Sequence, residues 1–197
     1  MRHANPPGAA AYILPVAMSD TLRQGARVLL RHPREEDEEE FIALTRSSRR
    51  FHAGWVAPPF SAEQFAAYLR RSRADHFEAL LVARREDHAL LGAINLSEIV
   101  RGNFQSAYLG YWIGAAHVRQ GYMREGLALV LDHAFKFHRL HRLEANIQPS
   151  NAASIRLVDS LGFRLEGLSP KYLKIGGRWR DHERWAILSE EWRGGPA

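Results

Sequence analysis

The chain has 197 residues, of which 46% are apolar and 25% charged, a composition typical of one globular domain with a solvated surface. Cysteine is absent, which excludes disulfides, thiolate metal sites and a cysteine nucleophile. The net charge of +5 favours an anionic partner such as a phosphate-rich cofactor, RNA or a ribosome-like surface.

The opening of the chain differs in character from the rest. Pro6, Pro7 and Pro15 interrupt any periodicity there, so we expect a mobile tail over 1–20 and a single domain over 21–197. No long apolar run exists, and the opening lacks the apolar stretch of a signal peptide. We therefore expect a cytoplasmic protein that does not contact a membrane.

Two helices are predicted before the main run of strands. Residues 26–31 predict a first strand, after which Pro33 and the acidic run 35–40 predict a helix start. Acidic side chains in a first turn complement the positive end of the helix dipole. Ser61 is expected to cap a second helix over 62–73.

Three strand-like runs follow, and their turn signals predict an antiparallel meander. The runs are 78–84, 90–100 and 106–114. The pattern then changes, because apolar residues recur at spacings of three and four from Gly121 to about Arg139. This spacing predicts one long helix that faces the core.

The C-terminal third alternates strands with one short helix. Strands are expected at 142–148, 163–175 and 180–188, and a helix at 152–161. Gly176 and Gly177 predict the hairpin turn that joins the last two strands. The fold class is therefore α/β (α+β), with a mixed central sheet of about seven strands and about four helices.

The loop that opens the long helix is the strongest candidate binding site. Residues 115–120 lead directly into Gly121, and the first N–H groups of a helix have no acceptor within it. Such an end suits a pyrophosphate, with Arg119 supplying charge. The alternative is an ordinary strand-to-helix turn. Neither a Walker A loop nor a G-x-G-x-x-G fingerprint is present.

Several segments together resemble the GNAT acetyltransferase family, and within it the RimJ group of ribosomal-protein-alanine N-acetyltransferases. The segments are 95–104 (NLSEIVRGNF), 108–114 (YLGYWIG), 149–154 (PSNAAS), 161–167 (LGFRLEG) and 172–182 (YLKIGGRWRDH). The resemblance covers about residues 26–192. It implies the GNAT fold, acetyl-CoA as acetyl donor, and a protein N-terminus, such as that of a ribosomal protein, as acceptor.

The resemblance also implies roles for single residues. The family's pyrophosphate loop falls on 118–123, where Gly121 matches while Val118 and Met123 depart from the pattern. Asn151 matches a residue that binds the pantetheine arm, and Ser154 matches one near the thioester sulfur; both are also ordinary helix-capping residue types. The expected cofactor-binding residues are Ile113, Val118, Arg119, Gln120, Gly121, Tyr122, Met123 and Asn151.

Direct attack of an amine on acetyl-CoA in a ternary complex is the expected mechanism, because no cysteine and no G-x-S-x-G elbow is present. Ser154 is expected to donate a proton to the departing thiolate. Glu98 is the first candidate for the general base and Glu144 the second. Some related enzymes carry an acidic residue at the position of Lys171, but a lysine there cannot supply that base. Trp55 and Tyr111 are expected to shape the acceptor site, although Trp55 could equally be a core residue.

The histidines do not predict a metal site. His133, His138 and His141 lack the i, i+4 spacing of a helical zinc site, and no partner acids are evident, so we expect surface or loop histidines, His117 included, and no metal.

Two other functions remain open. One is a small-molecule or antibiotic amine acetyltransferase, and the other is a non-catalytic RNA-binding module that uses the basic segment 136–142. A monomer and a homodimer are both compatible with the sequence. An α-amine is the favoured acceptor, because its pKa of about 8 leaves a larger neutral fraction at pH 7 than the lysine pKa of about 10.4.

Overall fold

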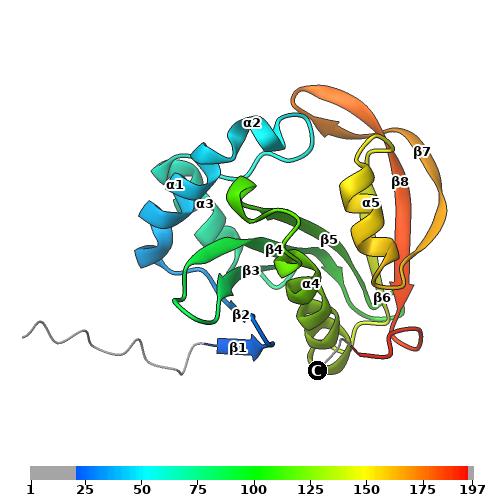
Figure 1. Ribbon diagram of the computed structural model, residues 1–197. Helices are drawn as coiled ribbons and strands as arrows, with labels where there is room; N and C mark the ends of the chain where they lie inside the picture. Colours follow the sequence, from blue (N-terminus) through cyan, green and yellow to red (C-terminus); the bar gives the residue numbers. More distant parts are fainter. Residues whose placement is uncertain (1–20, 195–197) are drawn as a thin grey trace, which may run out of the picture.

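The computed structural model describes residues 21–194, so the expected tail over 1–20 lies outside the described residues (Figure 1). Its centre is one eight-stranded sheet with the strand order β1-β2-β3-β4-β5-β6-β8-β7. The strands are β1 Thr21–Gln24, β2 Val28–Arg31, β3 Phe77–Arg84, β4 Leu90–Val100, β5 Ser106–Ile113, β6 Arg142–Ile147, β7 Arg164–Ile175 and β8 Arg178–Leu188. All neighbouring pairs are antiparallel except β5 and β6.

Five α-helices accompany the described sheet. They are α1 Glu38–Ser47, α2 Arg49–His52, α3 Ala62–Arg71, α4 Tyr122–Asp132 and α5 Ala152–Asp159. In Figure 1, α1 to α3 gather at one end of the sheet, α4 runs across its middle, and α5 lies beside β6 and β8. Between residues 21 and 194, none of the helices has the length and apolar character needed to span a bilayer.

Two short elements account for the difference from the predicted seven strands and four helices. β1 spans Thr21–Gln24 and pairs with β2 through an irregular register, and α2 spans only Arg49–His52. Four residues are too few to display a hydrophobic period, so pattern analysis passes over both elements. The predicted helix 121–139 also ends early, because α4 stops at Asp132 and continues as a π-helical turn, His133–Phe137.

Local signals in the sequence were reliable where one side chain or one turn decides the structure. Ser61 caps α3, accepting a hydrogen bond from the backbone N–H of Gln64 at 3.3 Å. Gly176 and Gly177 have φ values of +57° and +79°, the left-handed pair that a tight hairpin requires. The predicted meander is confirmed as β3, β4 and β5.

The sheet carries a hydrophobic core on each face. Leu80 and Val82 of β3 belong to the core beneath α4, whereas the alternate residues Ala79 and Leu81 belong to the core beneath α1 and α3. α4 packs closely on the sheet at Gly126, where a Cβ atom would lie 3.3 Å from side-chain atoms of Ile94 and Val82. This close packing holds α4 directly against β3 and β4.

The parallel pair β5 and β6 is joined over only three residues. Pairing ends at Tyr108 and Glu144, after which β5 continues to Ile113 and β6 to Ile147 without pairing to each other. β5 remains paired with β4, and β6 with β8. The two strands therefore splay apart in the middle of the sheet.

Candidate active site

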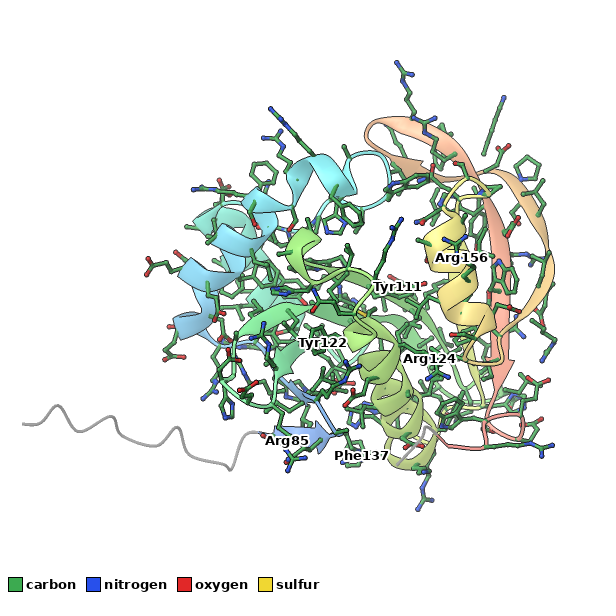
Figure 2. All side chains as sticks on the ribbon, in the orientation of Figure 1. Arg85, Tyr111, Tyr122, Arg124, Phe137 and Arg156 are labelled. Carbon is green, nitrogen blue, oxygen red and sulfur yellow. The ribbon has the colours of Figure 1, made fainter. Side chains whose placement is uncertain are left out.

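A cleft of about 720 Å³ opens at the splay between β5 and β6. Its lining combines residues of both strands with the loop before α4, the first turns of α4 and α5, and the loop after α2. Figure 2 shows Tyr111 between α4 and α5, with Arg124 on α4 and Arg156 on α5. All three residues line the cleft.

Gly121 is the N-cap of α4 and has a left-handed φ of +82°. Within residues 21–194, no side chain caps this helix end, so its first N–H groups are available to a ligand. A Cβ atom at this position would lie 2.9 Å from Nη2 of Arg27. The left-handed backbone conformation therefore favours glycine, whereas the flexible end of Arg27 could move away from a Cβ atom.

Arg27 holds the loop before α4 against the start of β2. Its Nη1 donates to the carbonyl of Gln120 at 2.9 Å, and its backbone N–H donates to Glu125 at 2.7 Å. Glu125 also accepts from the backbone N–H of Val28 at 3.1 Å. The role of Arg27 is not visible in the sequence, because its partners lie more than ninety positions away and no local pattern connects them.

Tyr111, Ser154 and Asn151 form a hydrogen-bonded group in the cleft. The hydroxyls of Tyr111 and Ser154 are 2.5 Å apart, and Oδ1 of Asn151 accepts from the backbone N–H of Ser154 at 3.2 Å. Burial raises the pKa of Tyr111 to about 12, against a smaller lowering by the Ser154 hydrogen bond. The phenol is therefore neutral at physiological pH and keeps its proton for hydrogen bonding.

The loop after α2 closes over one side of the cleft. Gln148, just beyond β6, donates to the carbonyl of Gly54 at 2.7 Å, and Trp55 lines the cleft beside this contact. His52 donates from Nε2 to the carbonyl of Ile113 at 2.9 Å. Burial lowers the pKa of His52, although this backbone hydrogen bond opposes the shift, so the ring is neutral at pH 7.

The cleft is positively charged. Three arginines line it, namely Arg119, Arg124 and Arg156, and none of the described lining residues is Asp or Glu. Together with the open end of α4, this charge suits an anionic ligand and disfavours a polycation.

Comparison with known proteins identifies the family. The profile of the acetyltransferase (GNAT) domain matches residues 27–164. The chain belongs to the GNAT family. It is therefore an N-acetyltransferase, and members of this family use acetyl-CoA.

Two relatives and one solved structure show how close the likeness is. The probable N-acetyltransferase YjcK of Bacillus subtilis is 31% identical over 176 residues, which cover 85% of this chain and 97% of YjcK. The [ribosomal protein uS5]-alanine N-acetyltransferase of Escherichia coli is 37% identical over 110 residues, 56% of this chain and 57% of that enzyme. The structure of Mycobacterium smegmatis RimJ in complex with CoA-disulfide aligns with a TM-score of 0.77 and 27% identity over 83% of each chain. The chain is thus a RimJ-like member of the GNAT family.

Most of the predicted cofactor-binding residues lie around this cleft. Its lining includes Ile113, Val118, Arg119, Gly121, Met123 and Asn151. Two others point elsewhere, because the amide of Gln120 donates to the carbonyl of Ala116 at 2.9 Å and the ring of Tyr122 lies under the guanidinium of Arg27. The available backbone N–H groups and the arginines fit the phosphates of acetyl-CoA.

The structure does not place the predicted general base in the cleft. Glu98 does not line it; this residue lies in an irregular part of β4, has a side chain 60% exposed, and faces Arg71 at 3.9 Å. Glu144 does not line it either, and accepts from Arg142 at 2.8 Å. Glu144 belongs to the last parallel pair, with Tyr108, so it lies next to the splay without lining the cleft.

His182 is a cleft residue that sequence analysis missed. It is 3% exposed on β8, and its Nδ1 donates to the carbonyl of Arg180 at 3.0 Å. In the neutral ring this leaves Nε2 as an acceptor. The signal was not visible in the sequence, because β8 reaches the cleft only through its pairing with β6.

The expectation of surface or loop histidines without acidic partners was wrong for His133 and His138. Glu78 accepts from Nε2 of His133 at 3.0 Å and of His138 at 2.8 Å, and the side chain of His133 is 2% exposed. His117 lines the cleft, and burial lowers its pKa, with the charge of Arg84 adding to the shift.

The segment 136–142 is less available for RNA than its composition indicates. Most of its basic side chains contact acids: Lys136 contacts Asp132, His138 contacts Glu78, His141 contacts Glu190, and Arg142 contacts Glu144 and Glu166. The paired charges weaken the case for a nucleic-acid surface.

Proposed function

We propose that this enzyme transfers the acetyl group of acetyl-CoA to the α-amine of a protein N-terminus that begins with a small residue such as Ala or Ser. The observation that carries the proposal is the charge of the cleft, which offers arginines but, among its described lining residues, no carboxylate. A polyamine or aminoglycoside would find no acidic partner there. The likeness to the uS5-alanine N-acetyltransferase of E. coli supports a ribosomal protein as the acceptor.

The absence of carboxylates from the described cleft lining also bears on the basicity of the acceptor. An α-amine, with a pKa of about 8, is neutral often enough near pH 7 to attack without a strong base. A lysine amine, with a pKa of about 10.4, would need one. In this proposal Nε2 of His182 takes a proton from the ammonium form of the α-amine, and the proton that the nitrogen loses as it bonds to the acetyl carbon passes to the departing thiolate.

The other cleft residues act on the thioester. Gly121 and Arg119 hold the pyrophosphate at the start of α4, and the unpaired edge of β5 aligns the pantetheine arm and the acetyl carbonyl. As the carbon–sulfur bond breaks, the hydroxyl of Ser154 donates a hydrogen bond to the thiolate. Tyr111, whose pKa of about 12 lies well above that of a thiol, orients this hydroxyl without losing its own proton.

Tandem mass spectrometry of peptides incubated with acetyl-CoA tests the acceptor. We expect Ala-starting and Ser-starting peptides to gain one acetyl group on the α-amine, at least about tenfold faster than an α-blocked peptide with an internal lysine. Spermidine and an aminoglycoside serve as small-molecule acceptors in parallel. Preferential turnover of either one, or acetylation mainly on lysine, would show that the acceptor class is different.

A further inference from the structure

A second cluster of chemically active side chains lies at the opposite end of α4 from the cleft. Glu78 of β3 accepts hydrogen bonds from three imidazoles: Nε2 of His133 at 3.0 Å, Nε2 of His138 at 2.8 Å, and Nε2 of His32 at 3.0 Å. The side chains of Glu78 and His138 are 12% and 18% exposed, and that of His133 is 2% exposed. None of these residues belongs to the cleft lining.

The backbone assembles this cluster through the π-helical turn that follows α4. In a regular α-helix, residues five apart point about 140° away from each other. Here the turn His133–Phe137 is π-helical, and the backbone N–H of His138 donates to the carbonyl of His133 at 3.1 Å. The wider turn brings His133 and His138 onto one face, which replaces the i, i+4 spacing of helical zinc ligands.

Strand alternation supplies the other two side chains. Glu78 has the same parity as Leu80 and Val82, whose side chains lie in the core beneath α4. His32 follows β2, where Val28 and Leu30 belong to the same core. The two strands therefore direct a carboxylate and an imidazole to the place where the π turn brings the imidazoles of His133 and His138.

We propose that Glu78, His133, His138 and His32 bind a Zn²⁺ ion. Three imidazole nitrogens and one carboxylate oxygen make a four-ligand set of the kind that zinc prefers. The ligand atoms of Glu78, His133 and His138 already lie within 4.8 Å of one another. A tetrahedral zinc site needs separations of about 3.3 Å, so these three ligand atoms would have to move closer by at most about 1.5 Å. His32, whose side chain is 54% exposed, completes the site by turning its ring toward the ion.

The surroundings of the two helical histidines set the expected affinity. Zinc at Nε2 moves the ring proton to Nδ1, where a hydrogen-bond acceptor normally orients the ligand. Nδ1 of His133 has no partner among the described residues, and Nδ1 of His138 lies 3.2 Å from Nη2 of Arg101, which is a donor. Missing outer partners typically weaken binding by about 10- to 100-fold, so we expect an exchangeable site with a Kd of about 1 µM.

Calorimetric titration of the metal-free full-length chain with Zn²⁺ tests the site. We expect one equivalent to bind, and Glu78→Gln and His138→Gln each to weaken binding by at least about tenfold. His141→Gln is the matched control, since His141 lies outside the cluster and contacts Glu190 at 3.3 Å. Co²⁺ in place of Zn²⁺ should give the strong visible absorption of a four-coordinate site in the parent and in the control only.

A further variant tests whether zinc binds to these four residues as one site or only to single histidines. Arg101→Gln replaces a donor near Nδ1 of His138 with a side chain that can accept, so it should tighten zinc binding by about 3- to 10-fold. Retained acetyl-CoA affinity shows that each variant is folded. The proposal is overturned if the parent binds no zinc at 100-fold the expected Kd of about 1 µM, or if His138→Gln and His141→Gln bind zinc equally.

Discussion

The two ends of α4 present opposite chemistry on one rigid element. At the N-terminal end, no side chain of the described residues caps the backbone N–H groups that follow Gly121, and arginines line the cleft. This arrangement suits anions. At the C-terminal end, a π turn gathers imidazoles around Glu78, an arrangement for a cation. The helix dipole has the matching sign at each end. The difference shows how one helix can serve two ligands of opposite charge.

The two ends are also expected to act independently. Twelve residues separate Gly121 from His133, which corresponds to about 18 Å along a helix. At this distance two unit charges interact by less than about 1 kcal/mol even at an effective dielectric constant of about 20, so the two ends are only weakly coupled. A change at either end should therefore leave the binding of the other ligand intact, which gives each prediction below a reciprocal control.

The largest effect is expected at the start of α4. Gly121→Asp should weaken acetyl-CoA binding by at least about 100-fold, or about 2.7 kcal/mol, because it adds negative charge beside the phosphates and places a side chain at a left-handed φ of +82°. Gly121→Ala separates the two causes. Asp tolerates the left-handed conformation better than Ala, so a larger loss with Asp isolates the charge. Calorimetry measures both variants, and zinc binding should be unchanged; equal losses with Ala and Asp would contradict the role of charge.

A smaller effect is expected at the thioester. Ser154→Ala should lower kcat about tenfold while acetyl-CoA affinity changes less than about threefold, because its hydroxyl acts on the leaving sulfur. Tyr111→Phe removes its partner at 2.5 Å, so the double variant should be about as slow as the slower single variant. If the fold-losses in kcat of the two single variants multiply in the double variant, the two hydroxyls act separately. An unchanged kcat in Ser154→Ala would remove that residue from the mechanism.

The last effect is expected at His182, where it should match that of Ser154→Ala at pH 7 and become smaller as pH rises. His182→Gln should lower the rate about tenfold at pH 7, where most α-amine carries a proton that must be removed. Above pH 8 the amine is neutral without help, so the defect should shrink as pH rises. The pH profile of kcat/KM with an Ala-starting peptide measures this, and His138→Gln, at the far end of α4, should follow the parent at every pH. A defect of constant size would indicate a structural role for His182 instead.

The order of elements was readable from the sequence because the signals for it are local. Hydrophobic periods marked seven of the eight strands, Ser61 marked the start of α3, and Gly176 and Gly177 marked the last turn. The loop over 118–123 and the group around Asn151 were recognisable by resemblance, since their chemistry resides in short contiguous segments. These segments identified the family before any contact was known.

The tertiary structure alone decided which side chains meet. Arg27 contacts Gln120 and Glu125 across more than ninety positions, and Glu78 meets His133 across 55. Such pairs depend on strand register and on the packing of α4, which no local period encodes. The π turn was equally invisible, because helical periodicity continues through it while the backbone changes its hydrogen-bond partners. The sequence therefore determined the family and the order of the elements, whereas the sheet decided that Glu98 lies outside the cleft and that Glu78 lies among histidines.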